Sequence, residues 1–169
     1  MASGRSTTFG RRRAALALAL AAATAVAGSL PAFAAAPDCK PVYLTFDTGH
    51  MGVAPLIADV LNRQQVKVTF FAAHERTQAG DGSLGEHWAP WWRARAAEGH
   101  EFASHTFDHV YWRADLPQGG FKVRASAGPR QNVTENWSTA QYCAELGRAA
   151  HRLEEVTGRK PLPLFRAPG

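Results

Sequence analysis

The chain has 169 residues, 46% of them hydrophobic and 20% charged, which is the composition of a globular protein of about one domain. The formal net charge is +5, but four arginines lie within the first 13 residues. Without those four, the 19 basic residues become 15 against 14 acidic residues, so the rest of the chain is nearly neutral. Such a balance lacks the basic patch of a nucleic-acid-binding protein, and we predict no nucleic-acid partner.

Residues 1–34 have the pattern of a secretory signal peptide. A basic start precedes the apolar run 14–28, and the small residues Ala32 and Ala34 follow at the positions that a signal peptidase recognises. Because the run is shorter than the roughly 20 apolar residues needed to cross a membrane, no stable membrane anchor is expected. We therefore predict cleavage after Ala34 and a mature protein that is periplasmic or secreted.

Export would place the two cysteines, Cys39 and Cys143, in an oxidising compartment. Two interpretations stay open at this point. The thiols form a disulfide that ties the mature N-terminus to a distant helix, or each is an independent small buried residue. A count of free thiols under denaturing conditions separates the two.

The first half of the mature chain alternates between strand and helix signals. Residues 41–46 are apolar, β-branched or aromatic, and they predict a strand that ends in a turn. Apolar residues recur at helical spacing over 53–64, and a second strand is predicted over 66–72. A helix is predicted over 86–98, where three tryptophans would pack against the sheet and Gly99 would end the helix.

The second half continues this order after a long interruption. A third strand is predicted over 101–104, and residues 115–137 are rich in glycine and polar residues and predict a long loop. A capping box predicts a helix over 138–157, and residues 162–165 begin a fourth strand. Strands that alternate with helices predict an α/β fold with a parallel sheet.

Polar side chains follow the ends of these predicted strands. Asp47, His74, His105 and Arg166 each stand where a strand finishes. In α/β barrels the carboxyl ends of the strands carry the active site, so this placement predicts a single site. His109 stands four residues after His105, and two imidazoles on one face of a turn can bind the same metal ion.

At these residues the chain resembles the polysaccharide deacetylases, which are carbohydrate esterases with a NodB-homology domain. The resemblance rests on TFDTG at 45–49, HTFDH at 105–109 and RAPG at 166–169. Three shorter stretches agree, namely VTFF at 68–71, EGHE at 98–101 and TGR at 157–159. The match runs over most of the mature chain, and the order and spacing of the motifs are specific.

The resemblance implies a distorted (β/α) barrel, of which residues 35–169 would supply only the N-terminal part with about four strands, truncated at the C-terminus. It also implies removal of acetyl groups from an N- or O-acetylated polysaccharide with the help of a divalent metal, zinc in particular. By motif position, Asp47 would be the general base and Arg166 would orient it. His105 and His109 would bind the metal.

Thr48 departs from the family pattern, which has a metal-binding aspartate there. His74 and His50 are the candidates for a third ligand; alternatively Asp47 itself coordinates, or metal binding is lost or weak. The late histidine that serves the family as general acid would lie beyond Gly169. Trp112 is expected to border the cleft and bind sugar. Two rival functions stay open: a catalytically impaired carbohydrate-binding relative, and a metal-free amidase of the same fold.

Overall fold

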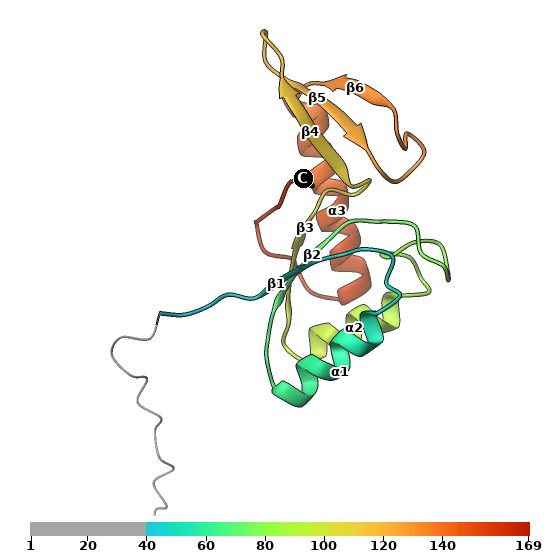
Figure 1. The fold of residues 1–169 in the computed structure, drawn as a ribbon, viewed down its shortest axis with the longest axis vertical. Coiled ribbons are helices and arrows are strands. Elements are labelled where there is room, and N and C mark those ends of the chain that lie inside the picture. The colour runs from blue at the N-terminus through green and yellow to red at the C-terminus, as the bar shows by residue number, and fades with distance from the viewer. Residues whose placement is uncertain (1–39) are drawn as a thin grey trace, which may run out of the picture. The chain divides into compact units, whose positions relative to one another are not determined.

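The computed structural model describes residues 40–169 (Figure 1). The predicted signal peptide and Cys39 lie outside the described residues, so those predictions, and the proposed disulfide to the exposed Cys143, stay predictions. Within residues 40–169, no helix has the length and apolar character needed to cross a membrane. The description that follows concerns the unit from Pro41 to Gly169.

A parallel sheet of three strands confirms the predicted α/β class. Its order is β1 (Thr45–Asp47), β2 (Thr69–Ala72) and β3 (Glu101–Ser104). The strands are shorter than predicted. Residues 41–44 do not extend β1, and the side chains of Val42 and Tyr43 are 92% and 85% exposed. Because β1 is an edge strand that pairs only with β2, the preceding residues 41–43 have no strand partner among the described residues and stay exposed.

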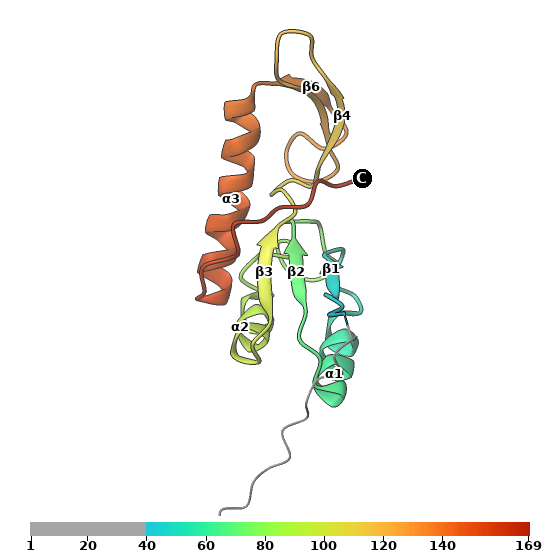
Figure 2. The ribbon, with the colours of Figure 1, turned by 90° about the vertical axis from the view of Figure 1, so that its left-hand side faces the viewer.

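Helices cover one face of the parallel sheet. They are α1 (Ala54–Gln64), α2 (Ala89–Ala97) and α3 (Thr139–Thr157). Figure 2 shows the three strands side by side, with α1 at the β1 end of the sheet and α2 and α3 at the β3 end. The register pairs Phe46 with Phe70 and Phe70 with Phe102, so these three rings share the helix-covered face.

Phe70 and Trp92 lie at the centre of the main hydrophobic core. Trp92 is fully buried, its ring packs edge-on against Phe70 at 5.8 Å, and its Nε1 donates to the carbonyl of Ser83 at 2.7 Å. This confirms the expectation that α2 packs its tryptophans on the sheet. The other buried members come from the helices, the strands and the loops between them: Met51, Ala54, Leu61, Val68, Ala72, Leu84, Ala89, Ala96, Phe102, Leu153 and Val156.

The capping signals at the ends of α3 are confirmed. The Ser138 hydroxyl accepts from the Gln141 N–H, and the Gln141 side chain accepts from the Ser138 N–H, which satisfies two N–H groups at the helix start. Gly158 follows the helix with φ 69°, the left-handed conformation that glycine adopts without steric cost. Gly99 after α2 has φ 88° and ends that helix in the same way.

The prediction of a long loop over 115–137 is wrong, because the chain forms a second, antiparallel sheet there. Its strands are β4 (Val110–Asp115), β5 (Phe121–Ala125) and β6 (Thr134–Trp137), in that order. Residues 116–120 connect β4 to β5 as a hairpin loop, in which Gly119 and Gly120 have φ of 82° and 97°. The alternating pattern of FKVRA at 121–125 was the overlooked strand signal. The apolar face of this sheet packs on α3, where Val110, Val123 and Ala125 of the strands form a buried cluster with Tyr142 of the helix.

The predicted fourth strand over 162–165 is present only as a bridge between Phe165 and Ser104. Backbone hydrogen bonds nevertheless keep this segment parallel to β3, since Ser104 N–H donates to Leu164 O and Arg166 N–H donates to Ser104 O. The described strands therefore form two open sheets and no closed barrel. What matters for the site is that this bridge brings Arg166 to the carboxyl end of β3.

Candidate active site

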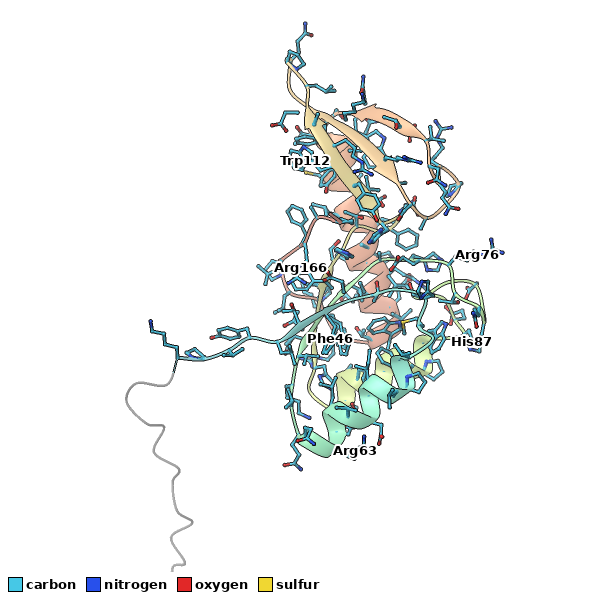
Figure 3. The ribbon with its side chains drawn as sticks, in the orientation of Figure 1. Phe46, Arg63, Arg76, His87, Trp112 and Arg166 are labelled. Atoms are coloured by element: carbon cyan, nitrogen blue, oxygen red, sulfur yellow. The ribbon has the colours of Figure 1, made fainter. Side chains whose placement is uncertain are left out.

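Three of the predicted site residues meet at the carboxyl ends of the parallel strands. Arg166 Nη1 donates to Asp47 Oδ1 at 2.6 Å, and its Nη2 donates to the Thr45 hydroxyl at 2.8 Å. The guanidinium carbon also lies 4.2 Å from the ring centre of Phe71, which belongs to the central strand β2. Figure 3 shows Arg166 near these strand ends. The arginine thus fixes the orientation of the Asp47 carboxylate with a charge-assisted hydrogen bond.

His105 stands beside this ion pair and presents one ring nitrogen to it. Its Nδ1 lies 2.9 Å from the carbonyl oxygen of Arg166, and its Nε2 lies 4.0 Å from Asp47 Oδ2. Because a carbonyl only accepts, Nδ1 carries the proton and Nε2 of the neutral ring holds the free lone pair. Burial lowers the pKa of His105, which keeps the ring neutral near pH 7.

His109 is the neighbour of His105, with ring centres 4.9 Å apart and nearly perpendicular planes. Its Nδ1 lies 2.6 Å from the Ser126 hydroxyl, which comes from the loop after β5. Burial, followed by the charge of His105, lowers the pKa of His109 to about 4. Ser126 was not predicted from the sequence, because it belongs to a segment that was interpreted as loop.

The turn that carries both histidines has an unusual backbone. Thr106 has φ 64° and His109 has φ 50°, a left-handed conformation that costs energy for residues with a side chain. Local hydrogen bonds hold it, since the Thr106 hydroxyl accepts from Val110 N–H at 2.7 Å and the Ser104 hydroxyl accepts from Thr106 N–H. This turn, rather than a helix, brings the two imidazoles together.

Helix α3 clamps the same turn from behind. The buried Glu145 carboxylate accepts from the Asp108 N–H at 2.5 Å, and Arg148 forms ion pairs with both Asp108 and Glu145. The Arg148 guanidinium also lies over the Phe107 ring at 4.3 Å. Burial raises the pKa of Glu145, and the N–H donors of the turn oppose that rise. Sequence reasoning missed this clamp, because its two halves are separated by 37 residues or more.

Thr48 serves the backbone at the position where the family pattern has an aspartate. Its hydroxyl accepts from the Ala73 N–H at 2.9 Å and faces the Ala73 carbonyl at 3.4 Å. The Thr48 N–H donates to Phe71 O, so the residue joins the ends of β1 and β2. A hydroxyl held in this way connects two strands and is not free to act as a metal ligand.

The two candidates for a third ligand lie in other surroundings. The His74 ring stacks on Phe107 at 4.8 Å and accepts from the Leu84 N–H at 3.2 Å. The charged groups that act on its pKa are Asp81, Arg152 and Asp108, after the larger lowering effect of burial. His50 is exposed after the β1 turn, where its charge acts on the buried carboxyl of Glu75. The structure gives neither residue an interaction with His105 or His109 within the described part of the chain.

Trp112 belongs to an aromatic cluster rather than to the histidine turn. It lies on β4, 40% exposed, with its ring centre 4.2 Å from that of Phe121 and 5.7 Å from that of Tyr142 (Figure 3). The β4 residue that does contact the site is its neighbour Tyr111, whose ring centre lies 5.1 Å from that of His109. Successive residues of a strand face opposite sides, so Trp112 next to Tyr111 points toward Tyr142 of α3 instead.

Comparison with known proteins agrees with this geometry. The family model for polysaccharide deacetylase matches residues 34–169, which is most of the chain. The chain belongs to the polysaccharide deacetylase family. No curated relative matches it.

Two solved structures share the polysaccharide deacetylase fold. One is the CE4 domain of a multidomain xylanase from the hindgut metagenome of Trinervitermes trinervoides, with 21% identity and a TM-score of 0.51. The other is a family 4 acetyl xylan esterase from Clostridium thermocellum in complex with a cobalt ion, with 20% identity and a TM-score of 0.51. Each alignment covers 75% of this chain and 47% of the other, so the chain spans about half of their length.

The donor set of this member of the polysaccharide deacetylase family fits a divalent metal ion through two imidazoles. In each ring Nδ1 is held by a protein oxygen and Nε2 is left for coordination, which is how metal-bound histidines are usually oriented. Within residues 40–169, no three His, Cys, Asp or Glu side chains are grouped closely enough to hold an ion. The described part of the chain therefore offers two adjacent imidazoles and a nearby Asp47, without a third preformed ligand.

The lowered pKa of His109 predicts a loss of stability in mild acid. Between pH 6.5 and about 4 the unfolded chain binds a proton at this residue that the folded chain does not bind, so acidification favours unfolding. We expect the free energy of unfolding, measured by urea titration with a chelator present, to fall between pH 7.5 and pH 5. His109→Gln should weaken that dependence. The exposed His151→Gln should leave it unchanged, and an equal slope in both variants would contradict the assignment.

Proposed function

We propose that this chain is part of an exported, metal-dependent hydrolase that removes acetyl groups from an N- or O-acetylated polysaccharide. On N-acetylated polymers it would act on carbon–nitrogen bonds other than peptide bonds. The observation that carries the proposal is the convergence of Arg166, Asp47 and His105 at the strand ends, with His109 beside them. Export rests on the signal-peptide pattern of residues 1–34.

Each residue has a chemical task in this proposal. Asp47 accepts a proton from the attacking water, and the hydrogen bond from Arg166 holds the carboxylate turned toward His105. His105 and His109 are the residues that would hold a divalent ion, zinc in the first instance. When bound, such an ion polarises the acetyl carbonyl and makes its bound water more acidic. Sugar contacts are assigned to Tyr111, whose ring lies beside His109, and to the half-exposed Trp112 of the neighbouring aromatic cluster.

A chelator experiment tests the proposal. With the full chain, acetate release from acetylated chito-oligosaccharide should stop after EDTA treatment and return when zinc or cobalt is added. The metal affinity of His105→Ala should be at least about tenfold lower, since removing an imidazole ligand reduces affinity by that factor or more. His151→Ala, on the exposed face of α3, is the matched control. Equal metal content in the two variants would refute the histidine assignment.

A second candidate function is sugar binding without catalysis, which Thr48 and the missing third ligand favour. The same experiment separates the two. Binding of the oligosaccharide without acetate release, at saturating metal, would support the binding protein. Acetate release that EDTA does not affect would support a metal-free amidase.

A further inference from the structure

A row of side chains leads from the histidine turn onto the antiparallel sheet. The ring centres of His105 and His109 are 4.9 Å apart, and those of His109 and Tyr111 are 5.1 Å apart. The guanidinium of Arg113 then lies 4.7 Å from the centre of the Tyr111 ring. Figure 2 shows the arrows of β2 and β3 pointing toward β4, so the site and this sheet are adjacent. A polymer that extends from the histidine turn therefore runs over the side chains on this face of the antiparallel sheet.

The register of the sheet assigns two further cations to the same face. Tyr111 pairs with Arg124, and Ala114 pairs with Lys122 after a bulge at residue 113. Lys122 and Arg124 are exposed, whereas Val123 between them is buried against α3. Alternation around the buried Val123 places Lys122 and Arg124 on the face of Tyr111, and the contact with the Tyr111 ring places the exposed Arg113 there.

No acidic side chain of the three strands neutralises this face. Asp115 pairs with Phe121, and Glu135 pairs with Val123, so both belong to the opposite face. In β6 the members of the cationic face are the neutral residues Thr134 and Asn136. Within residues 40–169, none of the three cations makes a salt bridge, and the only side-chain partner of Arg124 is the amide oxygen of Asn132, at 3.2 Å.

Resting on the proposed function, we infer that this face binds an anionic polysaccharide, and we assign Tyr111, Arg113, Lys122 and Arg124 as its contacts. Three uncompensated cations attract carboxylate or phosphate groups carried by the sugar units next to the one being deacetylated. The Tyr111 ring, adjacent to His109, supplies a flat apolar surface for a sugar ring. The chain outside the first 13 residues is close to neutral, so the local charge, rather than a general basic character, selects this ligand.

Binding to two polymers that differ in charge tests the inference. The probes are O-acetylated polygalacturonate, which is anionic, and O-acetylated xylan, which is neutral. The full chain should bind the anionic polymer about tenfold more tightly at 10 mM salt, as expected for three exposed ion pairs. That preference should fall below about twofold at 1 M salt, where the screening length shrinks to about 3 Å. Equal affinity for both polymers at 10 mM salt would overturn the inference.

Matched variants locate the effect. The triple variant Arg113→Gln, Lys122→Gln and Arg124→Gln should lose the preference at low salt. The control triple, Arg63→Gln, Lys67→Gln and Arg93→Gln, removes the same charge from exposed positions of other elements and should keep it. Replacing Arg113 and Arg124 by lysine should also keep it. A similar loss in the control triple, or tighter binding of a 20-nucleotide single-stranded DNA than of polygalacturonate, would overturn the inference.

The design separates this inference from the proposed function. Binding is measured without turnover, and acetate release from both polymers is measured in parallel. One outcome is that the chain prefers the anionic polymer through the three cations but releases no acetate. This outcome refutes the proposed function and supports the assignment of the cationic face. The other outcome is that acetate is released from both polymers and the triple variant does not change the binding preference. This outcome supports the proposed function and refutes the assignment of the cationic face.

Discussion

Replacing Asp47 by asparagine is expected to lower kcat for acetate release by about 1,000-fold, within the range of about 10² to 10⁴ that general base catalysis supplies. Asparagine keeps the shape of the side chain and can still accept from Arg166, but it cannot take a proton from water. The affinity for Co²⁺, measured by the visible absorption of the bound ion, should change by less than about threefold. Catalysis and metal binding are thereby measured separately on the same variant.

The metal readout decides between the two roles open to Asp47. Its carboxylate lies 4.0 Å from His105 Nε2, close enough that a modest movement would make it a ligand. If Asp47→Asn loses Co²⁺ as completely as His105→Ala does, Asp47 is the third ligand and another group activates water. Arg166→Lys provides the orientation control, since a lysine keeps the charge but not the paired contacts to Asp47 and Thr45. It should lower kcat less than Asp47→Asn does.

Glu145→Leu is expected to destabilise the chain by about 3 kcal/mol, because it leaves the buried N–H of Asp108 without its acceptor and removes one of the two ion-pair partners of Arg148. The clamp on the strained histidine turn is lost at the same time. The Co²⁺ absorption spectrum of the folded variant should therefore shift, since the two imidazoles are no longer held in one arrangement. Urea unfolding and Co²⁺ titration measure the two effects.

The same helix offers a matched control for Glu145. Glu154 is an exposed glutamate on α3, and Glu154→Leu should change the free energy of unfolding by less than about 0.5 kcal/mol. Glu145→Gln retains an acceptor for the Asp108 N–H and should recover the Co²⁺ spectrum. An unchanged spectrum in Glu145→Leu would show that the turn keeps its shape without the clamp.

Much of the fold was accessible to local patterns. The helical spacing in α1, the capping box of α3 and the apolar runs of β2 and β3 are properties of consecutive residues, and each predicted its element. The antiparallel sheet was missed because glycine and polar residues at 115–137 were weighed as loop signals. There the pairing of β5 with both neighbours and the burial of Val123 against α3 outweigh the loop signals.

The sequence by itself determined which chemical groups the site contains: the TFDTG, HTFDH and RAPG motifs name Asp47, the two histidines and Arg166, and their family. Only the tertiary structure decided how those groups are used. Asp47 and Arg166 are 119 residues apart, and the bridge beside β3 brings them within 2.6 Å. An oxygen from a segment far away in the sequence engages Nδ1 of each histidine and leaves Nε2 without a hydrogen bond to the described residues. For His105 it is the Arg166 carbonyl, and for His109 it is the Ser126 hydroxyl. Such choices depend on positions in space, which local sequence patterns do not encode.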